Sequence, residues 1–141
     1  MVILTALRTL LRNTAGVTAI VGQRSYKRRA PQRAPKPYVT LALASVDFLT
    51  RSQKQREAGQ NHKITARVQV DCYSTDEDEI DTLSDAVARA LDDYRGTTGG
   101  VTIYRSLQQD ERDNYEPLAD GSDVGVHRVT QDYKIEYLQP T

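Results

Sequence analysis

Apolar residues recur at helical spacing near the start of the chain. Within residues 2–13, four of them fall on one face of a helix, and threonines and arginines fall on the other. The apolar positions are Ile3, Leu7, Leu10 and Leu11. Asn13 and Gly16 are typical of a helix end, so a first amphipathic helix is predicted over residues 2–13. The apolar residues 16–22 that follow fit either one helical turn or a short strand.

A second amphipathic helix is predicted after residue 75. Its apolar stripe consists of Ile80, Leu83, Val87, Leu91 and Tyr94. Ser74 and Thr75 each precede an acidic residue by three positions, which is the spacing of a capping box. The acidic residues 76–79 stand where the helix dipole favours negative charge. Gly96, Gly99 and Gly100 are expected to end this helix.

Other segments have the pattern of β-strands. Residues 62–73 and 126–138 alternate between apolar and polar positions, which indicates strands with one buried face. The first buried face is Ile64, Ala66, Val68, Val70 and Cys72, and the second is Val129, Tyr133, Ile135 and Tyr137. Residues 38–46 are apolar on both sides, as in a strand covered on both faces. Residues 25–27 and 101–107 are further strand candidates.

The order of these elements predicts an α+β fold, a mainly antiparallel β-sheet with two α-helices packed on a face. The length fits a single domain spanning residues 1–141. Residues 108–123 are expected to form a loop or ragged hairpin that turns at Asp120 and Gly121. Residues 50–61 are polar and lack apolar groups to bury, so they are expected to form a long mobile loop.

The net charge is zero, but the charges are unevenly distributed. Residues 1–67 hold 13 lysines and arginines and two acids, a net charge of +11, and residues 68–141 hold 6 and 17, a net charge of −11. Three interpretations remain open. In the first, residues 1–67 bind nucleic acid. In the second, the basic half of one copy attracts the acidic half of a neighbouring copy. In the third, strands from both halves neutralise each other inside one sheet.

Residue types that carry catalysis are sparse. His62 and His127 each stand at the start of a predicted strand, and Cys72 lies on an apolar strand face. These three residues lack the spacing of a zinc site. The acidic residues 76–79 point in different directions around a helix, so they do not converge on a metal. We therefore expect no enzymatic activity, no cofactor and no metal.

A basic, proline-rich stretch precedes the strand at residue 38. Pro31, Pro35 and Pro37 exclude a helix or a central strand, so residues 28–37 are expected to form a stiff, extended and exposed connection. Its cationic residues are Arg28, Arg29, Arg33 and Lys36. They have no interleaved aromatic residues for base stacking, which favours a protein interface or a solvated loop over nucleic-acid binding.

The same region resembles a known family. Its layout is a first helix, a "V-x-x-x-V-G" segment, an arginine, an aromatic residue, "A-P-Q", and "P-Y-V" entering a strand. The matching positions are Val17, Val21, Gly22, Arg24, Tyr26, Ala30, Pro31, Gln32, Pro37, Tyr38 and Val39. Residues 70–74, the helical residues 86–91 and the closing strand near Tyr137 fit the same layout. The chain thus resembles the tail completion proteins, or tail terminators, of long-tailed bacteriophages. Extra basic residues between Tyr26 and Ala30 depart from the pattern, which leaves the length of that connection open.

The resemblance implies a structural virion protein that assembles as a hexameric ring in the host bacterial cytoplasm. Such a ring caps the tail tube, ends its growth and joins it to the head connector or head-closure protein, and DNA passes through its lumen without specific binding. The alternatives from other classes are a small nucleic-acid-binding protein that uses the basic half, and a different component of the head–tail connection.

Two sets of residues are expected to serve such a ring. Contacts with neighbouring subunits or the neck are expected from the basic stretch and from residues 50–61. The candidates are Arg28, Arg29, Arg33, Lys36, Arg51, Lys54 and Arg56. A lumen through which DNA moves should not hold phosphates, because each contact adds affinity. The acidic candidates for its wall are Asp110, Glu111, Asp113 and Glu116.

Overall fold

The computed structural model describes residues 2–48, 62–117 and 125–139. Three helices and six strands follow one another along the chain: α1 Val2–Arg12, α2 Ala15–Val21, β1 Ser25–Lys27, β2 Tyr38–Phe48, β3 His62–Ser74, α3 Glu77–Leu91, β4 Gly96–Thr98, β5 Val101–Pro117 and β6 Gly125–Gln139. The expected α+β fold is confirmed. The segment at residues 16–22, which the sequence left open, is the helix α2.

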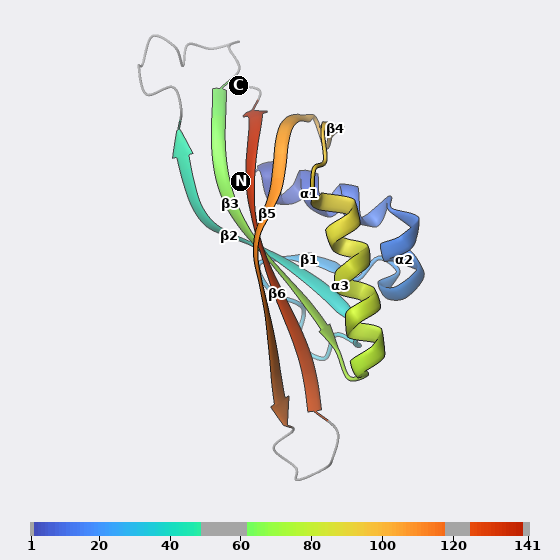
Figure 1. Cartoon of the computed structure of the whole chain (residues 1–141). Coiled ribbons are helices and arrows are strands. Elements are labelled where there is room, and N and C mark those ends of the chain that lie inside the picture. Colours follow the sequence, from blue (N-terminus) through green and yellow to red (C-terminus); the bar gives the residue numbers. More distant parts are fainter. Residues whose placement is uncertain (1, 49–61, 118–124, 140–141) are drawn as a thin grey trace.

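The strands form one sheet in the order β1-β2-β3-β6-β5-β4. All neighbouring strands are antiparallel except β1 and β2, which are parallel. The three helices lie on one face of this sheet (Figure 1). The opposite face has no helix among the described residues, and we call it the open face.

The core lies between the helices and the sheet. The alternating residues of β3 from Ile64 to Cys72 are fully buried, as predicted. The residues Ile3, Leu7 and Leu11 of α1 are buried in the same cluster, and each such side chain contributes about 1.5–3 kcal/mol when removed from water. The expected covering of β2 on both faces is wrong at its outer end, since Ala44 and Ser45 are exposed.

The first turn of α3 differs in detail from the prediction. The residue that caps the helix is Asp76, whose carboxylate accepts a hydrogen bond from the Asp78 N–H at 3.0 Å. Ser74 supports this cap, because its hydroxyl accepts from the Asp76 N–H and donates to Glu79. The helix ends at Leu91, five residues before Gly96.

The glycines that were expected to end α3 instead belong to the next strands. Gly96 begins β4, and Gly99 and Gly100 turn the chain from β4 into β5. Gly99 has a φ of +57° and lies against α1, where an added Cβ would come within 2.9 Å of the Ala6 Cα. The Thr98 hydroxyl donates to the Ala6 carbonyl at 3.1 Å. This turn is therefore one place where the first helix packs against the second half of the chain.

Strand β5 continues well beyond the predicted residues 101–107. It extends to Pro117 and pairs with β6 over its whole length, apart from two irregularities in register. The outer ends of β5 and β6 project beyond the helices as a two-stranded hairpin (Figure 1). Residues 108–117 are thus strand, although their polar composition had indicated a loop or ragged hairpin.

Two predictions fall outside the described residues. These are the mobile loop at residues 50–61, with Arg51, Lys54 and Arg56, and the turn at Asp120 and Gly121. In the part of the chain that the structure describes, no helix is long and apolar enough to cross a membrane.

Candidate assembly surfaces

The basic stretch forms an exposed arm at one edge of the sheet. We call residues 28–36 the cationic arm, which leaves the edge strand β1 and leads toward β2. Its four cationic side chains are exposed: Arg28, Arg29, Arg33 and Lys36. Its backbone is held by the Arg28 N–H, which donates to the Leu41 carbonyl at 2.6 Å, and by the Ala34 N–H, which donates to the Pro31 carbonyl at 3.0 Å. Arg28 and Arg33 have φ angles of 69° and 68°, so the arm is exposed as predicted but bent instead of extended.

The cations of the arm have no acidic partner among the described residues. The ion pairs that the structure describes join residues of the acidic half to one another: Arg95–Asp93, Arg112–Asp110, Arg112–Asp132 and Arg128–Asp71. None of these pairs joins the basic half to the acidic half. Within the part of the chain that the structure describes, ion pairs inside one copy therefore do not account for the charge of the arm.

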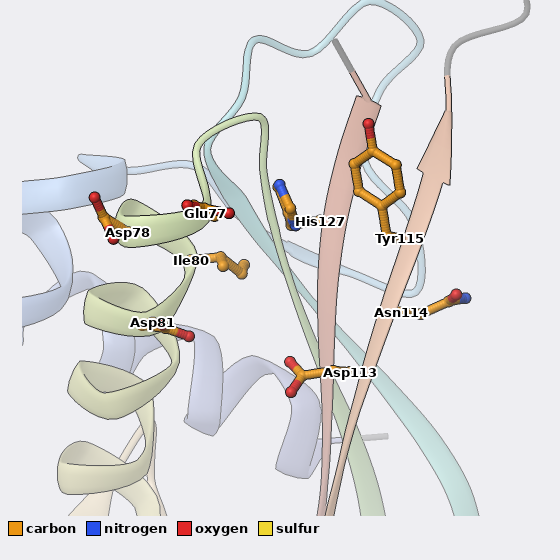
Figure 2. A pocket seen from close by; sticks show the side chains of 8 residues that line it. All are labelled: Glu77, Asp78, Ile80, Asp81, Asp113, Asn114, Tyr115 and His127. Carbon is orange, nitrogen blue, oxygen red and sulfur yellow. The ribbon is translucent and has the colours of Figure 1, made fainter. Parts of the chain in front are cut away.

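A groove lies between the first turns of α3 and the outer part of the β5–β6 hairpin (Figure 2). Its volume is about 470 Å³, and its lining residues are Glu77, Asp78, Ile80, Asp81, Asp113, Asn114, Tyr115 and His127. We call it the acidic groove, because four carboxylates line it without any lysine or arginine. The Asp113 side chain points toward α3, and Asn114 points away from it (Figure 2).

The aromatic wall of the groove is held by close packing. The Tyr115 and His127 rings lie 4.8 Å apart between centroids, with an angle of 48° between their planes. The same tyrosine passes over Gly125, where an added Cβ would lie 2.3 Å from its ring. Any side chain at residue 125 would displace Tyr115, so this glycine shapes the groove.

The four acidic lumen candidates lie on β5 but do not share one face. Successive residues of a strand point to opposite faces. Glu111 and Asp113 point to the helix side, where Glu111 accepts a hydrogen bond from Gln131 and Asp113 lines the acidic groove. Asp110 pairs with Arg112, and Glu116 stands one step from Tyr115 on the opposite side. A lumen wall formed by one face of β5 would therefore carry two of the four acidic candidates.

A buried carboxylate ties β3 to β6 on the open face. Asp71 is 5% exposed and accepts hydrogen bonds from the Arg128 Nε at 3.0 Å and from the Thr130 hydroxyl. Gln69 donates to its second oxygen at 3.0 Å. The hydrogen bond to Asp71 raises the pKa of the Arg128 guanidinium, which also lies over the Tyr73 ring at 5.7 Å from its centroid. This cluster fixes the sheet at the level where the arm joins β2.

A second buried polar group was not anticipated from the sequence. Gln131 is fully buried on the helix side of β6, and its amide donates to the Ser84 carbonyl and to Glu111, each at 2.9 Å. Its oxygen accepts from the buried Tyr133 hydroxyl at 2.7 Å. The sequence does contain one sign of this buried group, because Gln131 is a lone polar residue between Val129 and Tyr133 on a strand face that is otherwise apolar. This network holds the hairpin against α3.

The residues considered for catalysis were Cys72, His62 and His127. Cys72 is fully buried, as its place on the apolar face of its strand predicted, and burial raises the pKa of its thiol. His127 lies in the acidic groove, whereas His62 begins β3. Within residues 2–48, 62–117 and 125–139, no three His, Cys, Asp or Glu side chains are grouped to hold a metal ion.

Comparisons with known proteins identify a family and a shared fold. The chain matches the family described as "Tail completion protein gp17" over residues 5–137. Among solved structures, it is similar to a chain of the "Virion of native gene transfer agent (GTA) particle". The two chains are 16% identical, with a TM-score of 0.60 over 96% of this chain and 93% of the other, which shows a shared fold. No curated protein matches the chain.

Proposed function

The chain belongs to the tail completion protein gp17 family and is a structural protein of a phage tail, and we propose that it forms a ring that caps the tail tube. In this proposal the ring is hexameric, ends tube growth and joins the tube to the head connector or head-closure protein. The subunits assemble in the host bacterial cytoplasm, and the ring stays in the virion. The role requires no enzymatic step and no cofactor.

The observation that carries this proposal is the positive charge at one edge of the sheet, which has no acidic partner among the described residues. A ring is built from heterologous contacts, in which one surface of a copy meets a different surface of the next. The exposed arm supplies a cationic surface at the β1 edge, and the carboxylates of α3 and Asp113 line a groove on the helix side of β5 and β6. Two different surfaces of opposite charge support head-to-tail association of copies.

Assembly is expected to weaken as salt rises. Exposed ion pairs are screened, and the screening length falls from about 10 Å at 0.1 M salt to about 3 Å at 1 M. Sedimentation velocity across this range should show rings giving way to free subunits. Assembly that is unchanged or stronger in high salt would mean that apolar contacts hold the copies together.

The experiment that tests the role combines the purified chain with growing tail tubes under electron microscopy. We expect rings of the chain at tube ends, and tubes that stop lengthening when it is added. Tubes that lengthen equally with and without it would contradict the proposed function.

The exposed cationic side chains of the arm also fit the second candidate, a nucleic-acid-binding protein, because phosphates attract exposed arginines. Under the ring proposal, DNA crosses the lumen without specific binding, so the free chain should bind duplex DNA weakly. Tight binding that weakens steeply with salt would favour the second candidate instead.

A further inference from the structure

One row of paired residues crosses the sheet from the cationic arm to the acidic groove. Tyr38 pairs with Tyr73, Tyr73 pairs with Arg128, and Arg128 pairs with Asn114. Pro37 and then Tyr38 follow the arm in the sequence. At the other end of the row, Asn114 lines the groove. Tyr38, which follows the arm, and Asn114, which lines the groove, therefore lie in one row across the sheet, with β3 and β6 between their strands.

The arm and the groove of one copy do not meet. Strands β2, β3, β6 and β5 lie side by side, so three spacings of about 4.8 Å, or about 14 Å, separate the first from the last. Among the described residues, no hydrogen bond or ion pair joins the arm to the groove. Among the described residues, neither surface therefore serves as the partner of the other within one copy.

The two surfaces match in charge and in form. The arm offers three arginines and one lysine, and the groove offers the carboxylates Glu77, Asp78, Asp81 and Asp113. A guanidinium binds a carboxylate through two parallel hydrogen bonds, which adds direction to the attraction. The groove of about 470 Å³ is within the size range of clefts that enclose a bound group, about 300–1,000 Å³. The arm is also an anchored, bent segment, so little ordering is needed before it docks.

We propose that the cationic arm of one copy docks in the acidic groove of the next copy. This contact rests on the ring proposed above and names the surfaces that form it. Each copy gives its arm on one side and receives an arm on the other, so the contact is heterologous and repeats around a closed ring.

The test uses reciprocal charge reversal in the full chain. The arm variant carries Arg28→Glu, Arg29→Glu and Arg33→Glu, and the groove variant carries Asp78→Lys, Asp81→Lys and Asp113→Lys. Each variant alone presents like charges on both surfaces, so we expect the concentration needed for half-assembly to rise at least about 100-fold. The control variant reverses Arg89 and Arg95, two exposed arginines outside the arm, and should assemble as the wild type does.

Mixing the two variants is the decisive step. The reversed arm then fits the reversed groove, and the native arm of the groove variant fits the native groove of the arm variant, so rings of alternating copies should form. Circular dichroism and thermal melting of each variant establish that it is folded. Equal amounts of the folded variants should recover assembly to within about tenfold of the wild type, since two matched contacts per copy are restored.

The outcomes separate this contact from the ring itself. Wild-type chains that never form rings would overturn the ring and the contact together. Wild-type rings with an unaffected arm variant, or a mixture that fails to recover assembly, would overturn the contact alone. An arm variant that assembles normally but loses binding to duplex DNA would assign the arm to DNA.

Discussion

Replacing Gln131 by alanine is expected to destabilise the chain by about 3 kcal/mol, because a buried polar group left without its partner costs about 1–3 kcal/mol. The substitution leaves the buried Tyr133 hydroxyl and the Ser84 carbonyl without the partner that Gln131 supplies. The melting temperature should fall by roughly 10 °C for a chain of this size. Urea unfolding measures the free energy, and calorimetry measures the temperature.

The control for this prediction is Gln109→Ala, the same substitution at an exposed position of β5. It should change stability by no more than about 0.5 kcal/mol. Tyr133→Phe should lower the free energy of unfolding less in the Gln131→Ala background than in the wild type. In that background the Tyr133 hydroxyl has already lost its partner Gln131, so removing the hydroxyl costs little. Equal losses from Gln131→Ala and Gln109→Ala would show that the buried network does not stabilise the fold.

Arg128→Ala is expected to destabilise the chain by about 2–3 kcal/mol, since it leaves a nearly buried carboxylate without its cation. Asp71 would retain only the hydrogen bonds from Gln69 and Thr130. Arg128 also belongs to the row that crosses the sheet from arm to groove, so ring assembly should weaken along with stability. Urea unfolding and sedimentation velocity measure the two effects.

Two companion variants sharpen this prediction. Arg105→Ala removes an arginine that is exposed on β5 and has no described acidic partner, so it should leave stability within about 0.5 kcal/mol of the wild type. Adding Asp71→Asn to Arg128→Ala should recover part of the loss, because the buried group is then neutral. If the double variant is less stable than Arg128→Ala, the unpaired carboxylate is not the cause of the loss.

The elements that the sequence predicted well are those set by local patterns. The alternation from Ile64 to Cys72 places each apolar side chain on one face, and all of these positions are buried. The helical spacing of Ile3, Leu7 and Leu11 is local in the same way, and these residues form the buried stripe of α1. Such patterns depend on the geometry of one element and need no partner to be recognised.

The outer half of β5 could not be predicted in this way. Residues 108–117 are polar and exposed over most of their length, so they contain no buried alternation. Their strand conformation comes from pairing with β6, a tertiary interaction that overrides local preference. The end of α3 was misplaced for a related reason, because the glycines after it serve the turn between β4 and β5 and the close approach to Ala6.

The two candidate surfaces differ in how far the sequence revealed them. The arm is one continuous stretch, so its charge and prolines were visible directly. The groove joins the first turns of α3 to residues more than thirty positions later on β5. No local pattern brings Asp81 and Asp113 together, and only the packing of the helix against the sheet places them on one surface.

Cryo-electron microscopy of the tail end that faces the head tests the central claim most directly. In particles that contain this chain, the account predicts a single ring of it between the last layer of the tail tube and the head connector. Copies of the chain along the length of the tube or at the distal tip, with none at the head-facing end, would contradict it.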